Sequence, residues 1–181
     1  MAWEKSHKLK SKQRILESAA QLFTRYGFEQ VSINQIMANA KLTRGAFYSH
    51  FSSKSDLYAQ AMIKGSQLAK EQHTHDSTTC LATLSQRYLS QAHRDEQLQH
   101  LCPLAFLISD INQQDENVKN TYTEVFKRFI DNAQRLTKDE NTALQTAALM
   151  IGGLALAKAV NDNELSDKLL IACQSGVSQL V

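Results

Sequence analysis

Apolar residues recur every three or four positions along most of this 181-residue chain, which is the spacing of one face of an α-helix. No segment alternates with the period of two that a half-buried strand requires. No repeat of fixed period is visible either, which argues against a helical solenoid. The pattern therefore predicts an all-α fold, and we expect nine helices.

Capping and turn residues divide residues 11–53 into three helices. Gly27 is expected to end the first helix, because glycine readily takes the left-handed conformation that closes a helix. Ser32, with glutamine three residues later, is a capping-box pattern and predicts the start of the second helix. A short turn at 41–42 leads to Thr43, which we expect to cap the third. Two short helices joined by such a turn form a helix-turn-helix.

Six further helices are expected after residue 53. They are predicted at 54–71, at 81–89, from 103, at 118–136, from 140 to about 160 and at 165–180, with a polar loop at 73–79. Ser53 with Asp56 and Thr137 with Glu140 are further capping patterns at two of these starts. We expect one domain in residues 1–53 and a second in 54–181.

Charge is distributed unevenly along the chain. Residues 1–60 hold nine Lys and Arg against four Asp and Glu, a net charge of +5, whereas residues 61–181 hold eleven against fourteen, a net charge of −3. A basic segment of this kind is either a solvated surface or a surface that meets a polyanion. Because the same segment contains the predicted helix-turn-helix, we favour the second interpretation, with DNA as the polyanion.

The second helix of a helix-turn-helix lies in the major groove of DNA. Arg44 can donate twice to guanine, Thr43 can bond a base or a phosphate, and Gly45 lets the backbone approach closely. Phe47 either packs under this helix or touches a thymine methyl. We therefore predict that bases are read at the start of the third helix.

A second group of side chains is predicted to contact phosphates, which positions a protein without reading sequence. Tyr48, His50 and Lys54 follow the reading residues and offer donors. Ser32 and Lys54 also lie at helix starts, where free amides favour a phosphate. Lys12 belongs to a basic arm that is expected to follow the DNA backbone.

The run from Ile15 to Phe51, ILESAAQLFTRYGFEQVSINQIMANAKLTRGAFYSHF, with SSKSDL after it, resembles the N-terminal domain of the TetR family of transcription regulators. The matching positions are Ala20, Leu22, Phe23, Gly27, Ser32, Ile36, Gly45, Tyr48, Phe51 and Lys54. The resemblance implies a repressor that a small-molecule effector releases from a palindromic operator. The family often has alanine at Met37 and glycine at Lys41. The altered turn leaves open an alternative, a helical ligand-binding or adaptor protein without operator binding.

Small residues form a stripe on the helix expected at 140–160. Ala148, Gly152, Ala155 and Ala159 recur at helical spacing with Ile151 beside them, so another helix can approach closely. Packing against the preceding helix is one interpretation. Because palindromic operators match a protein two-fold axis, we instead expect the last two helices to form a homodimer interface, as the resemblance also implies.

The effector pocket is then expected among the fourth to seventh helices. The candidates are apolar and aromatic residues with a few polar tips, as small-molecule pockets tend to have. They are Met62, Leu84, Tyr88, Cys102, Phe106, Tyr122, Phe126 and Phe129. Any of these side chains can instead belong to the hydrophobic core without lining a pocket.

Other chemistry has weaker signals. No paired nucleophile and base, glycine-rich phosphate loop or carboxylate pair stands out, so we expect neither an enzyme nor a bound cofactor. His73, His75 and Cys80 have no closed metal-ligand spacing and are expected in a solvated loop, so no metal is predicted. Cys102, with His100 nearby, is a candidate reactive thiolate.

The expected location is cytoplasmic. The three cysteines are widely spaced and odd in number, which fits reduced thiols better than a disulfide framework. No uninterrupted run of eighteen apolar residues occurs, and the N-terminus is polar and basic, so neither a membrane span nor a secretory signal is expected.

Overall fold

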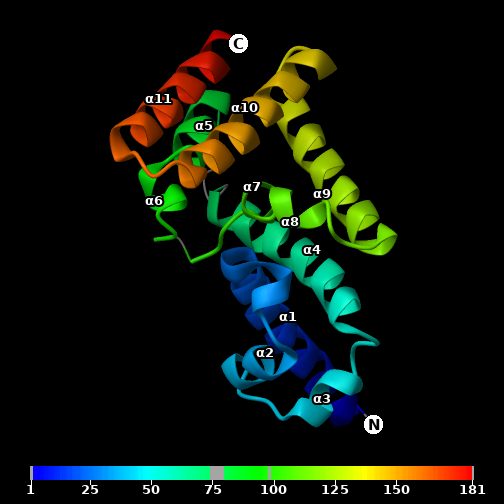
Figure 1. Cartoon of the computed structure of the whole chain (residues 1–181). Helices are drawn as coiled ribbons and strands as arrows, with labels where there is room; N and C mark the ends of the chain where they lie inside the picture. The colour runs from blue at the N-terminus through cyan, green and yellow to red at the C-terminus, as the bar shows by residue number, and fades with distance from the viewer. Residues whose placement is uncertain (1, 74–79, 98, 181) are drawn as a thin grey trace.

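A computed structural model describes residues 2–73, 80–97 and 99–180 of the chain (Figure 1). Within these residues there are eleven α-helices and no strand, which confirms the all-α prediction. The helices are α1 (Ala2–Gln30), α2 (Ile33–Asn39), α3 (Arg44–Tyr48), α4 (Lys54–His73), α5 (Leu81–Tyr88), α6 (Gln91–Arg94), α7 (Pro103–Phe106), α8 (Ile108–Ile111), α9 (Glu116–Gln134), α10 (Glu140–Ala159) and α11 (Asn163–Gln179). The polar loop expected at 73–79 falls almost entirely outside the described residues.

The expected number of nine helices was wrong among the described residues. The helix predicted from residue 103 is divided into α7 and α8 at Leu107, whose φ of −107° and ψ of 4° leave the helical region. The four-residue helix α6 was not predicted at all. Helices of four residues are barely one turn long, so their sequences carry no repeat of apolar positions.

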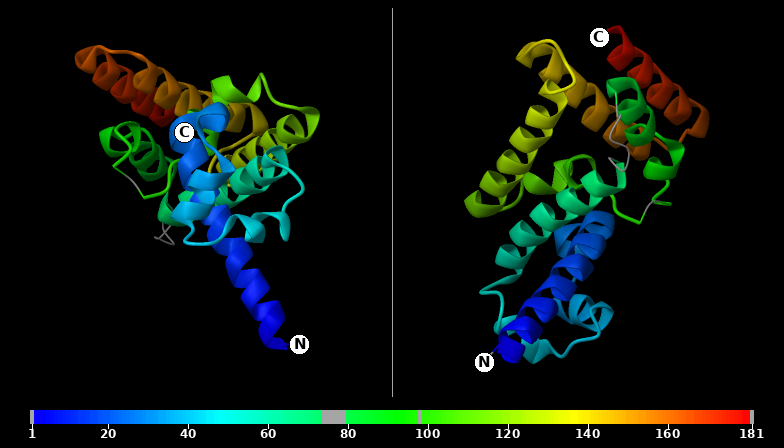
Figure 2. Two further views of the ribbon diagram at one scale, coloured as in Figure 1. Left: turned by 60° about the horizontal axis from the view of Figure 1, so that its bottom comes forward. Right: turned by 180° about the vertical axis from the view of Figure 1, so that it is seen from behind.

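Helix α1 begins at Ala2, nine residues before the predicted start at Ser11. Its first two turns project from the rest of the molecule in one view of Figure 2. Gly27 has φ 77°, in the left-handed region, and kinks the helix before a last turn. The ring of Phe28 then stacks on that of Phe23, with 6.0 Å between centroids. The prediction that the main helix ends at Gly27 is confirmed.

The turn between α2 and α3 forms despite its lysine. The capping box predicted at Ser32 is confirmed, since the Ser32 hydroxyl accepts from the Gln35 amide at 3.2 Å and the Gln35 side chain accepts from the Ser32 amide at 2.7 Å. Lys41 has φ 53°, and the Leu42 amide donates to the Met37 carbonyl at 3.0 Å. The altered turn residue therefore does not disrupt the helix-turn-helix.

Two predicted caps were wrong in detail. Thr43 stands at the cap position of α3, but its side chain makes no capping hydrogen bond. Helix α10 is capped by Asp139 and not by Thr137, because the Asp139 carboxylate accepts from the Thr142 amide at 2.8 Å. A carboxylate at a helix start also meets the positive end of the helix dipole.

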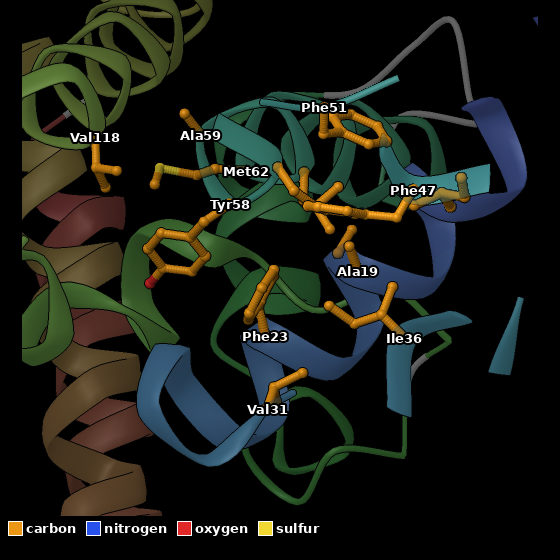
Figure 3. Close-up of a cluster of buried hydrophobic side chains, with 14 of the residues drawn as sticks. Ala19, Phe23, Val31, Ile36, Phe47, Phe51, Tyr58, Ala59, Met62 and Val118 are labelled. Carbon is orange, nitrogen blue, oxygen red and sulfur yellow. The ribbon is translucent and has the colours of Figure 1, made fainter. Parts of the chain in front are cut away.

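Two groups of buried apolar side chains meet along α4. The first fills the space between α1, α2, α3 and the start of α4, and it includes Phe23, Ile36, Phe47 and Tyr58 (Figure 3). The second includes residues of α5, α7, α9, α10 and α11, together with Ala69 of α4. Since α4 supplies side chains to both, a domain boundary between residues 53 and 54 remains a proposal.

Helices α10 and α11 lie side by side at the end of the molecule opposite α2 and α3 (Figure 1). By length and composition α10 could cross a membrane, and 44% of that segment is buried inside the protein. Polar interruptions kept this helix from appearing as an uninterrupted apolar run in the sequence. A core helix of a soluble protein passes the same test, so this feature is weak evidence for a membrane span.

Candidate functional site

The start of α3 presents an exposed polar face. Thr43, Arg44 and Gly45 are all exposed, and a Cβ placed on Gly45 would meet only the Thr43 hydroxyl, at 4.0 Å. Tyr48, one turn later, is 61% exposed. Arg44 donates to its hydroxyl in a long hydrogen bond of 3.3 Å, which groups the two polar tips. Nothing in the described protein covers this face, so it is free to meet a partner.

Phe47 lies on the opposite face of α3 and is 1% exposed. Its ring stacks on Phe51 at 5.8 Å (Figure 3). It also meets the Tyr48 ring edge to face at 5.1 Å. Of the two roles predicted for Phe47, packing is the one that fits this burial, and contact with a thymine methyl does not.

The residues predicted to contact phosphates are partly engaged within the protein. The Lys54 ammonium lies 4.1 Å from the centre of the Phe28 ring, and the Lys12 ammonium lies 5.6 Å from that of Phe51. Such cation–π contacts are worth about 0.5–1 kcal/mol at exposed sites. Both ammonium groups therefore sit over aromatic rings beside the helix-turn-helix, and Ser32 remains exposed at the start of α2.

His50 connects the end of α3 to α1. The Ser11 hydroxyl donates to the Lys8 carbonyl at 2.9 Å, so its oxygen accepts from the His50 Nε2–H, also at 2.9 Å. Burial lowers the pKa of His50, and the charges of Lys8 and Lys12 lower it further. Neighbouring lysines with a neutral histidine make this a positively charged corner of the domain.

Sequence reasoning missed the residues that hold the turn in place. Arg14 on α1 donates to the Ala40 carbonyl at 2.6 Å and to the Lys41 carbonyl at 3.3 Å. Ser18, one turn later, donates to the Ile36 carbonyl at 2.8 Å. Ser18 is three residues from the buried Ile15, which is a signal that could have pointed to it, whereas Arg14 is exposed and has no such signal. Through these bonds α1 fixes the position of α2 and α3.

The helical body contains a cavity of about 360 Å³ between α4, α5, α7, α9 and α10. It is lined by Ser66, Gln67, Ala69, Lys70, Leu84, Tyr88, Cys102, Leu104, Val125, Arg128, Phe129, Asp131, Asn132, Ala133, Arg135 and Met150. Four predicted pocket residues are among them, namely Leu84, Tyr88, Cys102 and Phe129. The polar and charged residues of the cavity wall were not predicted, because the candidates were chosen as apolar and aromatic side chains.

The other four predicted pocket residues lie elsewhere. Met62 packs in the first apolar group, below the helix-turn-helix (Figure 3). Phe106 stacks on His93 at 5.5 Å and carries the Lys158 ammonium on its ring. Tyr122 donates to the Leu104 carbonyl at 2.7 Å, and Phe126 packs against the second apolar group. Helical spacing alone could not separate these core positions from the cavity wall.

The thiol predicted to be reactive is buried. Burial raises the pKa of Cys102, although a hydrogen bond with Tyr88 acts in the opposite direction. A reactive cysteine needs a lowered pKa and access, so this environment does not support the thiolate hypothesis. Among the described residues no three potential metal ligands come together, and of the loose metal-ligand set His75 lies outside them.

The stripe predicted for dimer formation is divided by the structure. Ala148 and Ala159 are exposed, Gly152 and Ala155 are half-buried, and a Cβ on Gly152 would meet nothing within 4 Å. Ile151 is 4% exposed and belongs to the second apolar group, so it does not face outward. Leu144, Leu165 and Ile171 add exposed apolar area on α10 and α11 that the prediction missed, and Leu156 beside the stripe is exposed as well.

These features define a helix-turn-helix protein whose helical body encloses a cavity. Residues 15–61 match the family described as bacterial regulatory proteins, tetR family. The solved structure of a TetR-family transcriptional regulator from Cytophaga hutchinsonii superposes with a TM-score of 0.79 at 16% identity and covers 96% of each chain. The helix-turn-helix segment of this chain therefore matches the tetR family, and the whole chain has the tetR-family fold.

Curated relatives match mainly over the helix-turn-helix. The A-factor receptor protein of Streptomyces griseus is 45% identical over 49 residues, which is 27% of this chain and 17% of that protein. The HTH-type transcriptional regulator AcrR of Shigella flexneri is 42% identical over 50 residues, 28% of this chain and 23% of that protein. The chain thus aligns with less than a third of the length of either relative.

Proposed function

We propose that this protein is a transcriptional repressor that binds a palindromic operator as a homodimer and is released by a small-molecule effector. The observation that carries the proposal is the exposed start of α3, where Thr43, Arg44 and Gly45 face away from the protein. The second helix of a helix-turn-helix enters the major groove with its first residues toward the bases.

Charge supports binding to DNA at the same end of the molecule. The net charge of +5 on residues 1–60 suits a phosphate backbone, whereas the remainder carries −3. Ser32 and Tyr48 offer exposed donors, and Lys12 and Lys54 lie beside the helix-turn-helix. Arginine at the start of the reading helix can pair with the O6 and N7 atoms of guanine.

The partner in the dimer is proposed to be a second copy of this chain. Leu156, Leu165 and Ile171 are exposed on α10 and α11, Ala148 of α10 is exposed as well, and Gly152 is half-buried. An isologous contact of this face would place two helix-turn-helix domains at the same end of the assembly. Their operator half-sites are expected about one turn of DNA apart, roughly 34–36 Å, or a multiple of it.

Known relatives support regulation as the role. One match, 33% identical over 60 residues, is named as a probable repressor of the acrEF/envCD operon in Escherichia coli, and another is named as a receptor for A-factor. The cavity in the body would take the effector, and the expected location is the cytoplasm. By linkage, an effector that weakens DNA binding must itself bind the DNA complex more weakly by the same factor.

The test begins with selection of bound sequences from random double-stranded DNA, followed by anisotropy titrations at several salt concentrations. A palindrome should emerge, and the affinity should fall steeply as salt rises because counterions are released. In a homodimer Arg44→Ala removes one bidentate base contact from each half-site, so it should weaken this complex by about 30-fold or more, since each such contact is worth about 1–3 kcal/mol. Lys127→Ala removes a positive charge from exposed α9 and should leave the affinity unchanged.

Two outcomes would contradict the proposal. Recovery of no preferred sequence would remove operator binding as a function. An equal loss of affinity in Arg44→Ala and Lys127→Ala would show that only the overall charge matters and that α3 does not read bases.

A further inference from the structure

We propose that the cavity selects an amphipathic anion, a molecule with an elongated apolar body and one carboxylate at its end. Its role as effector rests on the function proposed above, but its chemistry follows from the cavity wall. The lining residues divide into a buried apolar floor and a charged rim, and the two parts require different ends of a ligand.

The floor of the cavity is apolar. Leu104, Val125 and Met150 are buried there beside Tyr88 and Cys102, and they come from four different segments of the chain. A volume of 360 Å³ corresponds to about twelve waters at roughly 30 Å³ each. Burial of an alkyl or aryl group in such a space is favourable in proportion to its apolar area. The floor therefore suits the hydrocarbon part of a small ligand.

The rim of the cavity has an excess of positive charge. Lys70 of α4 and Arg128 and Arg135 of α9 are cationic, and Asp131 is the one acidic residue in the described wall. Asn132 lies between them and accepts a hydrogen bond from the Lys70 ammonium at 2.9 Å. The charged side chains are exposed at the mouth, so an anionic group would meet them while its apolar body lies inside.

The rim arginines differ from four other basic residues of the helical body, each of which has a carboxylate partner. These four residues are Arg94, Lys127, Lys158 and Lys168. Among the described residues neither Arg128 nor Arg135 forms an ion pair. This contrast arises although residues 61–181 have a net charge of −3, so acidic side chains are not scarce.

The geometry of α9 places these donors in a row. Arg128, Asn132 and Arg135 are spaced by four and three residues, so they share one helix face. Val125 and Phe129 on the same face also line the cavity. A guanidinium presents a planar fork of donors that matches a carboxylate in two parallel hydrogen bonds. A carboxylate at the rim can therefore be held by α9 while its apolar body extends along the same helix.

Isothermal titration calorimetry of the full chain with octanoate, 1-octanol and octylamine tests this selection directly. Octanoate is expected to bind roughly tenfold or more tightly than 1-octanol, since hydrogen bonds to a charged group outweigh neutral ones. In the series hexanoate, heptanoate, octanoate, each added methylene should tighten binding by about fourfold. Equal binding of octanoate and 1-octanol, or tightest binding of octylamine, would overturn the proposal.

A pair of variants on α9 isolates the rim. Arg128→Gln is expected to remove most of the preference for octanoate over 1-octanol while 1-octanol binds as before. Lys127→Gln is the matched control, because Lys127 is the adjacent residue, is 64% exposed and pairs with Glu124 outside the cavity wall. Loss of the preference in both variants would mean that only the general charge of α9 matters, and would also overturn the proposal.

Anisotropy with operator DNA separates this inference from the proposed function. Selective octanoate binding together with release of the DNA is the expected result. Selective binding without release would support the ligand class and contradict the effector role. A protein that binds its operator but shows no preference for octanoate would overturn the ligand class and leave the repressor proposal standing.

Discussion

Helices α10 and α11 approach each other so closely at Gly153 that a larger residue there would force neighbouring side chains to shift. A Cβ built on this glycine would lie 2.6 Å from the Cys173 sulfur and 3.0 Å from the Cys173 Cβ. It would also lie 3.2 Å from a Leu89 methyl group. The adjacent Gly152 provides a natural comparison, because a Cβ there would meet nothing within 4 Å.

These distances set the expected sizes of two substitutions. Alanine in place of glycine inside a helix gains about 1 kcal/mol, so Gly152→Ala should stabilise the protein by about that amount. Gly153→Ala has the same gain, but overpacking of a core contact costs about 1–3 kcal/mol. Since a contact of 2.6 Å is shorter than real Cβ contacts, the cost should lie near the upper end. A net loss of about 2 kcal/mol is expected.

Urea unfolding followed by far-ultraviolet circular dichroism measures both variants. Titrations at several protein concentrations separate the stability of the folded chain from a change in association, which matters because Gly152 lies on the proposed dimer face. Cys173→Ala removes the nearest atom, so Gly153→Ala and Cys173→Ala should be coupled by about 1 kcal/mol in a double-mutant cycle. The reasoning fails if Gly153→Ala is as stable as Gly152→Ala, or if the double variant is additive within about 0.5 kcal/mol.

Three further predictions concern the helix-turn-helix and the side chains packed around it. Lys41→Gly should raise the free energy of unfolding by about 1 kcal/mol, because φ is 53° at this position and glycine adopts such a conformation without strain. Lys41→Ala is the control, and equal urea midpoints for the glycine and alanine variants would contradict the prediction. Asp110→Ala should lower the free energy of unfolding by about 2–3 kcal/mol, because the Asp110 carboxylate accepts from the Tyr58 hydroxyl at 2.6 Å and from the Phe28 amide at 3.0 Å. A smaller loss of stability in Asp110→Ala than in Tyr58→Phe would refute this. The pKa of His50 is lowered from 6.5 in the folded protein, so its contribution to stability is present above that pH and is lost as the pH falls through the lowered value. His50→Gln should therefore flatten the dependence of stability on pH between about 7 and 5, and parallel curves would exclude the effect.

Local signals in the sequence predicted most of the helix-turn-helix. Ser32 with Gln35 defined a helix start, and Gly27 has the left-handed conformation predicted for it. Lys41 is also left-handed, at the turn position where the family often has glycine. The start of α1 was missed because residues 6–10 are all exposed, and a helical segment without a buried face shows no apolar periodicity. Asp139 was passed over as a cap because Thr137 also fitted the pattern.

The residues that line the cavity were harder to predict from the sequence than the helices around it. Helical spacing shows which residues share a face of one helix, but the cavity wall combines residues from several helices whose relative positions depend on packing. Ile151 illustrates the limit, because it is three residues from Ala148 and four from Ala155 and yet lies on the buried side of the stripe. Arg128 and Arg135 appeared as ordinary solvated charges until the fold placed them at the rim.

Helix α4 takes part in both groups of buried side chains, and this has a consequence for how the molecule unfolds. Leu57, Tyr58 and Met62 complete the packing around α1 to α3, while Ala69 belongs to the packing of the body. If either group of buried side chains came apart, apolar surface of α4 would be exposed, and the packing of the other group against α4 would be weakened. The chain should therefore melt in a single cooperative transition, and a fragment cut after residue 53 would lack the side chains that keep its three helices folded.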